Sequence, residues 1–133
     1  MASFVNKPLL DVDLDIGSKR ATVIVSGRVS FSPLERQLMQ SGLAMTIKGK
    51  LMGADSGFLG DDDFILSLGQ QSFTNNQPIE VDYRLVKTNV AGATLNEDSP
   101  GADELRADLT IFNSLNPDSA VAKTSSNQVT GNF

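Results

Sequence analysis

Hydrophobic and polar side chains alternate with a period of two along most of this chain. Between residues 10 and 16, every second position is apolar and the positions between them are aspartates. The apolar positions are Leu10, Val12, Leu14 and Ile16, and the aspartates are Asp11, Asp13 and Asp15. This alternation is typical of a β-strand with one face in a hydrophobic core and the other in water.

The same pattern recurs after each group of turn residues. It predicts strands over 21–31, 43–51, 64–68, 79–85 and 105–111, with 72–74 extending or following the strand at 64–68. Strands this evenly spaced, joined by turns and without alternating helices, are typical of antiparallel folds. We therefore predict an all-β fold, an antiparallel β-sandwich of about eight strands.

One segment departs from the period of two. Residues 32–35 read Ser-Pro-Leu-Glu, with a capping serine, a proline suited to the first helical position and a glutamate that completes a capping box. Leu34 and Leu38 are four residues apart, and Gly42 stands where a C-terminal cap is expected. This signature predicts one short helix near 33–41.

Composition limits the chemistry available to the protein. The chain has 133 residues and a net charge of −5, and it contains neither Cys nor His. These absences exclude disulfides, thiolate and imidazole metal sites, and the Ser-His-Asp triad. Any metal would be a hard cation held by oxygen, with calcium the first choice. This length predicts one domain that can bury a core without a staple.

The C-terminal residues differ in composition from the rest. We assign residues 1–112 to the sandwich core and 113–133 to a polar C-terminal extension of the same domain, in which only Asp118 and Lys123 are charged. Short apolar groups at 120–122 and 129–133 predict edge strands. A polar, extended segment suits either an edge strand of its own sheet or an inter-subunit arm that adds a strand to a neighbour.

Two acidic segments resemble each other. Residues 51–65 and 95–105 each lead from an apolar strand end, through an Asp-Ser pair and a glycine, to acidic residues at the next strand start. Calcium takes about six to eight oxygen ligands, mainly carboxylates and carbonyls, and glycine-containing loops can wrap it. The candidate metal ligands are Asp55, Asp61, Asp63, Asp98 and Asp103. In architecture alone this resembles C2-type modules; solvated turns are the alternative, because turns favour the same residues.

Four apolar residues are candidate interface positions. Phe58 and Leu59 lie between glycines within the first acidic segment, either as a docking anchor or as a lid folded onto the core. Val129 and Phe133 lie in the polar extension, where an edge strand or arm would present them to a partner.

Several partner classes are disfavoured by the same composition. Basic residues are scattered and base-stacking aromatics are few, so we expect no nucleic-acid binding. No apolar run approaches the length of a transmembrane segment. The start of the chain lacks a classical signal peptide, so we expect a cytoplasmic protein or one exported without a leader. The shortage of aromatic residues makes a carbohydrate partner unlikely.

These observations favour a protein that is not an enzyme. We expect a structural or interaction module, a self-assembling β-sandwich subunit of a larger complex whose partner is itself or another protein. The first alternative is a calcium-dependent, C2-like binding module that uses the two acidic segments. The second is a carbohydrate-binding module or a carboxylate-based hydrolase. No cofactor is expected other than calcium in the first alternative.

Overall fold

The computed structural model describes residues 1–53, 63–95 and 103–131. The strands are β1 (Ser3–Asp15), β2 (Arg20–Ser30), β3 (Met45–Gly53), β4 (Asp63–Phe73), β5 (Glu80–Ala91), β6 (Asp103–Asn113), β7 (Ala122–Ser125) and β8 (Val129–Gly131). The helices are α1 (Pro33–Gln40) and α2 (Gly92–Leu95). The prediction of an antiparallel β-sandwich with one short helix near 33–41 is confirmed, and α2 is an unpredicted additional turn.

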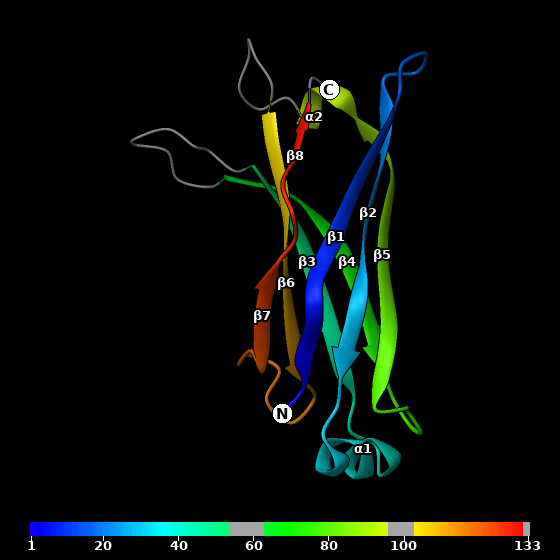
Figure 1. The fold of residues 1–133 in the computed structure, drawn as a ribbon, viewed down its shortest axis with the longest axis vertical. Coiled ribbons are helices and arrows are strands. Elements are labelled where there is room, and N and C mark those ends of the chain that lie inside the picture. Colours follow the sequence, from blue (N-terminus) through cyan, green and yellow to red (C-terminus); the bar gives the residue numbers. More distant parts are fainter. Residues whose placement is uncertain (54–62, 96–102, 132–133) are drawn as a thin grey trace.

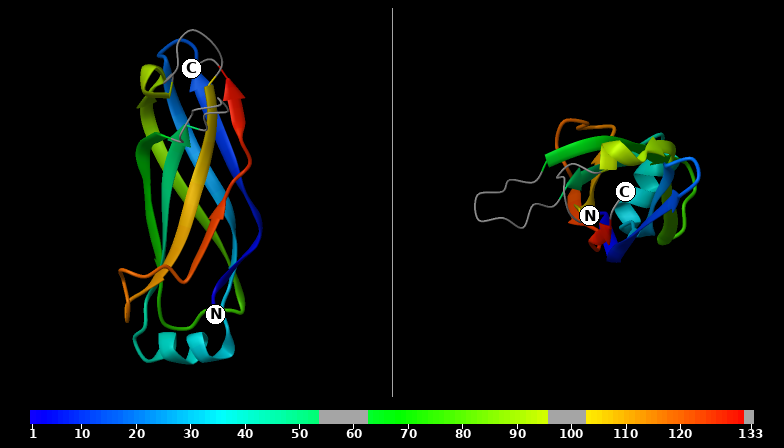
Figure 2. Two further views of the ribbon diagram at one scale, coloured as in Figure 1. Left: turned by 90° about the vertical axis from the view of Figure 1, so that its left-hand side faces the viewer. Right: turned by 90° about the horizontal axis from the view of Figure 1, so that it is seen from above.

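The strands form two antiparallel sheets that face each other across one core (Figures 1 and 2). Sheet A has the order β1-β2-β5. Sheet B has the order β4-β3-β6-β7, and β8 pairs with β6 beyond the end of β7. Strand β1 lies beside β7 and β8 without pairing with them, while β4 lies beside β5. The molecule therefore has two seams at which one sheet meets the other.

The core is filled by the apolar positions of the period-two pattern. Fully buried side chains from both sheets include Val23 and Val25 of sheet A and Ile47 and Leu109 of sheet B. Met39 of α1 and Leu95 of α2 are also fully buried. Because α1 and α2 lie at opposite ends of the sandwich, these two side chains close the core at its two ends (Figure 1).

Two strands contain irregularities that the sequence pattern did not predict. Strand β1 begins earlier than expected, at Ser3, because it crosses an irregularity between Val5 and Leu9, where Asn6 has a φ of 63°. Residues 64–74 were expected to hold a short strand with a separate or extended end. The extended alternative is confirmed, since β4 is continuous from Asp63 to Phe73. Two register shifts against β3 absorb its extra residues. Bulges of this kind keep a strand paired while raising its twist.

Gly49 in β3 sets how closely the sheets approach. A Cβ atom at this position would lie 2.7 Å from a methyl carbon of Leu85 in sheet A and 2.8 Å from one of Leu109 in β6. Both leucines are buried in the core, so either would have to shift against its neighbours to admit the extra atom. The absence of a side chain at Gly49 is thus required by packing across the core.

We predict that Gly49→Ala lowers the free energy of unfolding by about 1–3 kcal/mol, as overpacking of a dense core does. Urea denaturation followed by circular dichroism measures this change. Gly17→Ala is the control, because a Cβ there meets only the Asp15 carboxylate at 3.4 Å. Equal stability of the Gly49→Ala and control proteins would show that the core at Gly49 is loose.

Candidate interaction surface

The predicted calcium ligands fall largely outside the described residues. Asp55, Asp61 and Asp98 lie in 54–62 and 96–102, which the structure does not describe. Asp63 and Asp103 are the first residues of β4 and β6, and only their backbone is described. Within the described part of the chain, no three acidic side chains are grouped closely enough to hold a metal ion.

The register nevertheless brings the strand ends that flank both acidic segments to one end of sheet B. Gly53, the last residue of β3, pairs with Asp63 on one side and with Leu105 on the other. Asp103 precedes Leu105 by two residues on β6. Asp63 and Asp103 therefore begin strands that are separated only by β3, at the end opposite α1 (Figure 1).

The predicted interface residues are distributed differently. Phe58, Leu59 and Phe133 lie outside the described residues. Val129 is half-buried, pairs with Leu105 of β6 and packs against the core. In this structure, Val129 therefore contributes to the subunit's own sheet.

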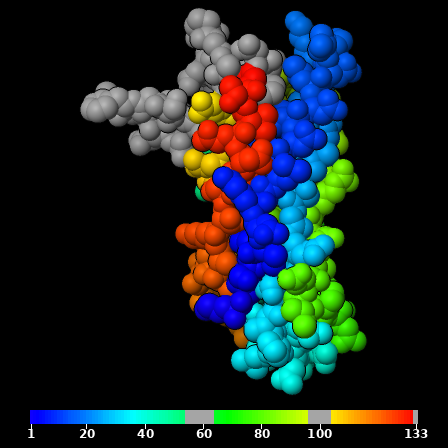
Figure 3. Space-filling model, viewed as in Figure 1, coloured from blue at the N-terminus to red at the C-terminus, as the bar shows by residue number. Residues whose placement is uncertain are grey.

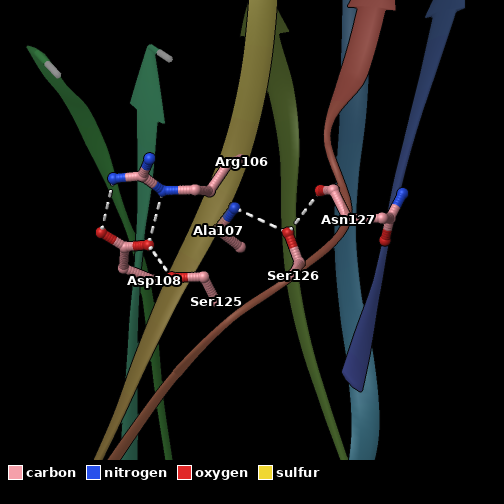
Figure 4. A network of polar contacts seen from close by, with 6 residues as sticks. All are labelled: Arg106, Ala107, Asp108, Ser125, Ser126 and Asn127. Carbon is pink, nitrogen blue, oxygen red and sulfur yellow. Dashed lines mark hydrogen bonds and ion pairs between the residues drawn. The ribbon is translucent and has the colours of Figure 1, made fainter.

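The C-terminal segment is tied to β6 by paired strands and by Ser126. Strand β7 pairs with Asp108–Ile111 and β8 with Asp103–Leu105. Between them, the backbone N–H of Ser126 donates to the Ala107 carbonyl at 2.8 Å, and the Ala107 N–H donates to Ser126 Oγ at 2.8 Å (Figure 4). Tyrosine aside, Ser126 is the only polar or charged residue that is buried in the described part of the chain.

Asn127 carries this connection across the seam to sheet A. The Leu10 N–H of β1 donates to Asn127 Oδ1 at 2.8 Å, and Asn127 Nδ2 donates to the Leu10 carbonyl at 3.4 Å. The side-chain amide thus presents the acceptor and donor that a backbone peptide group of a neighbouring strand would present. The second seam has a similar bond, since the Arg84 N–H of β5 donates to Gln71 Oε1 of β4 at 3.0 Å.

Asp108 holds β7 to the outer face of β6. Its carboxylate accepts from Arg106 Nε at 2.8 Å and from the Ser125 hydroxyl at 2.7 Å (Figure 4). Partial burial alone would raise the pKa of Asp108. The hydrogen bonds from Arg106 and Ser125, together with the charges of Arg106 and Lys50, outweigh burial and leave this pKa below its ordinary value.

Helix α1 is fixed at the other end of the sandwich by several contacts. Ser32 and Glu35 form the predicted capping box, with bonds of 3.2 Å and 2.9 Å. Glu35 Oε2 also accepts from the Ala2 N–H at 2.8 Å, which ties the N-terminal segment to the helix. Arg36 Nε donates to the Gln77 carbonyl at 2.9 Å, which holds the β4–β5 connection alongside.

The fixed helix presents apolar side chains to solvent. Leu34 and Leu38, four residues apart on one face, are 64% and 38% exposed, whereas Met39 occupies the core. Ile79, whose carbonyl accepts from the Phe31 N–H, and Leu115, next to the Ser114–Ala44 contact, are exposed at the same end. With Met1, five of the nine exposed large apolar side chains of the described residues lie here. Figure 3 shows α1 in cyan at this end.

We name this group the apolar end; it comprises Met1, Leu34, Leu38, Ile79 and Leu115. Sequence reasoning identified the helix but assigned no interface role to its leucines. The sequence did contain a signal for their exposure. The capping box fixes the N-terminus of this two-turn helix, so Met39 can anchor the rest of it to the core without the leucines. The sequence gives only a weak indication of the roles of Ser126 and Asn127, because they are simply polar residues between the short apolar groups at 120–122 and 129–133.

Comparison with protein-family models, curated proteins and solved structures finds no match for this chain. No helix in the described ranges is both long and apolar enough to cross a membrane. Function must therefore be inferred from the surface and the site chemistry of this chain alone.

We predict that Asp108→Asn destabilises the protein at neutral pH by about 1 kcal/mol or less, because the ion pair is partly solvated. A carboxylate with a lowered pKa stabilises the native state above its unfolded-state pKa, and this contribution is lost as the pH falls through the folded-state value. The difference between wild type and variant should therefore shrink below about pH 4. Thermal unfolding at several pH values measures it.

Asp118→Asn serves as the control, since Asp118 is exposed and the change removes the same charge. An Asp108→Asn effect that stays constant from neutral to strongly acidic pH would contradict the assignment of a stabilising, ionised Asp108.

Proposed function

We propose that this protein is a non-enzymatic structural or interaction module, a β-sandwich subunit that assembles with copies of itself through the apolar end. The observation that supports this proposal is the exposed Leu34–Leu38 face of a helix that is otherwise fixed. Large apolar side chains gathered at one end of a small domain mark contact surfaces more often than scattered ones do.

The seams favour contact through the ends over strand addition. Addition of a strand requires an edge with free backbone N–H and C=O groups. At one seam Asn127 occupies both backbone groups of Leu10, and at the other Gln71 occupies the N–H of Arg84. The sheets thus close against each other, while the apolar end keeps side chains available for a partner.

Burial of the apolar end would favour association. Complete burial of a leucine-sized side chain contributes about 1.5–3 kcal/mol relative to leaving it in water. Leu34, Leu38, Ile79 and Leu115 are 64%, 38%, 58% and 77% exposed, so each contributes only part of this value, and together they offset part of the entropy lost when two molecules associate. Because Ser32, Glu35 and Arg36 already fix the helix, little ordering of α1 is needed on binding.

We predict that Leu34→Glu shifts the protein toward monomer, because a charge in an apolar contact must lose its water without gaining a partner. Light scattering after gel filtration, over a range of protein concentrations, measures the mass. The wild-type protein should show a mass above that of one chain, and the variant should dissociate at concentrations at least about tenfold higher.

Gln40→Glu is the matched control, since it adds the same charge to an exposed position of the same helix. The control should assemble as the wild type does, and circular dichroism should show both variants folded. A wild-type protein that stays monomeric, or a Leu34→Glu variant that assembles normally, would refute assembly through the apolar end.

Calcium binding is the second candidate function, favoured by the register of sheet B. Asp63 and Asp103 begin strands on either side of β3, so both acidic segments adjoin one end of the sheet. Carboxylates brought near one another repel unless a cation lies between them.

If calcium binds there, millimolar calcium should raise the melting temperature, because a ligand specific for the native state stabilises it. Asp61→Asn combined with Asp103→Asn should abolish that rise. Glu80→Gln combined with Asp118→Asn, which removes as much charge elsewhere, should leave it intact. No rise in the wild type, or a rise that survives the first pair of changes, would rule out this calcium site.

A further inference from the structure

An open depression of about 970 Å³ lies on sheet A, where β1 interrupts its pairing with β2. Its lining includes the irregular segment of β1 at Asn6 and Lys7, the facing backbone at Gly27, and the side chains of Leu9 and Val86. Leu9 and Val86 are 61% and 41% exposed. The depression thus combines an apolar rim with a break in the hydrogen-bonded ladder.

The hydroxyl of Tyr83 lies beneath this break without a hydrogen-bond partner. Tyr83 lines the depression and is 2% exposed, and a Cβ atom on Gly27 would lie only 2.5 Å from its Oη. Among buried side-chain nitrogen and oxygen atoms of the described residues, Tyr83 Oη alone has no partner. The lack of a side chain at Gly27 therefore leaves room for the Tyr83 hydroxyl, which is free to form a hydrogen bond.

An unpaired buried hydroxyl is costly, and native structures rarely keep one without a reason. Burial raises the pKa of Tyr83, so the hydroxyl keeps its proton and can donate a hydrogen bond to an acceptor. The ring itself is held in place by an edge-to-face contact with Phe4, with centroids 6.0 Å apart. The donor is consequently positioned in advance of any ligand.

Charge in the depression favours an anionic acceptor. Lys7, Arg28 and Arg84 line it against a single carboxylate, Asp82, although the whole chain has a net charge of −5. Asp82 and Glu80 pair with Arg28 at 2.8 Å and 3.5 Å. Lys7 and Arg84 are exposed and form no ion pair with any described residue.

We propose that this depression is a binding site for a small carboxylate that carries a short apolar chain. Lys7 and Arg84 hold the carboxylate, and the apolar chain lies over Leu9 and Val86. The Tyr83 hydroxyl is covered in the structure without a ligand; when the break between β1 and β2 opens, it donates to one of the carboxylate oxygens. Charge-assisted bonds of this kind are the stronger class of hydrogen bonds. The lining of the depression contains none of the residues of the apolar end, so the proposal does not depend on the proposed assembly.

Hexanoate is the probe, and it is titrated into the isotopically labelled protein of 133 residues. Binding is followed by the chemical shifts of the backbone amides. We expect saturable shifts at Lys7, Gly27 and Arg84, with a dissociation constant in the millimolar range. Hexanamide, which has the same chain without the charge, should bind about tenfold more weakly or not at all.

Two variants test the assignment of the binding groups. Tyr83→Phe removes only the unpaired hydroxyl and should weaken hexanoate binding about tenfold. Without hexanoate, the amide shifts of the variant away from residue 83 should match those of the wild type. Arg84→Gln, at an exposed position, should weaken binding by a similar factor. Lys123→Gln, which removes an exposed cation from sheet B, is the control and should bind as the wild type does.

Three results would overturn the proposal. The first is an absence of saturable shifts with hexanoate in the wild type, and the second is equal affinity for hexanoate and hexanamide. The third is unchanged hexanoate binding in either Tyr83→Phe or Arg84→Gln, which would show that the group concerned does not contact the carboxylate.

Discussion

The closure of this sandwich depends on side-chain amides that replace missing backbone hydrogen bonds. At the seam between β1 and the C-terminal segment, Asn127 satisfies both the N–H and the carbonyl of Leu10, while Ser126 satisfies the N–H and carbonyl of Ala107. Each such hydrogen bond adds only about 1 kcal/mol to the free energy of unfolding, because the same groups bond to water in the unfolded chain. Leaving these groups buried without a partner would cost more than that. The seam is therefore bridged at Leu10, where both backbone groups have a partner in the C-terminal segment.

This arrangement determines which surfaces remain for function. A sheet edge with free backbone groups invites unwanted pairing with another chain, and natural proteins cover or interrupt such edges. Here the edges face each other across bridged seams, and the C-terminal segment serves its own sheet. Contact with a partner is left to side chains, which gather on the exposed face of α1 and around the break in β1. Assembly and ligand binding can thus occupy separate parts of one small domain.

The positions of the strands and of α1 were predictable from the sequence, whereas the packing and hydrogen bonds between these elements were not. Alternation with a period of two identified the strands because each has one buried face, and the Ser32–Glu35 capping box located α1 because its bonds are local. The orientation of α1 was not evident, since Met39 and the leucines compete for the core and only packing decides between them.

Longer-range contacts were beyond the sequence pattern. Nothing near Asn127 marks its partner as Leu10, which is 117 residues away. The irregularity in β1 above Tyr83 similarly depends on a register between β1 and β2 that alternation alone does not fix. Of the predicted calcium ligands, the structure adds the backbone positions of Asp63 and Asp103, which begin strands flanking β3.

The most direct test of this account is amide hydrogen exchange at Leu10 and Ala107, the two N–H groups that donate to side chains of the C-terminal segment. If the segment closes the seam of its own subunit, both amides should be protected to the same degree in dilute and in concentrated solution. If these amides exchange freely in dilute solution and become protected only when the protein is concentrated, the segment is instead an arm that reaches a second copy, and the account is wrong.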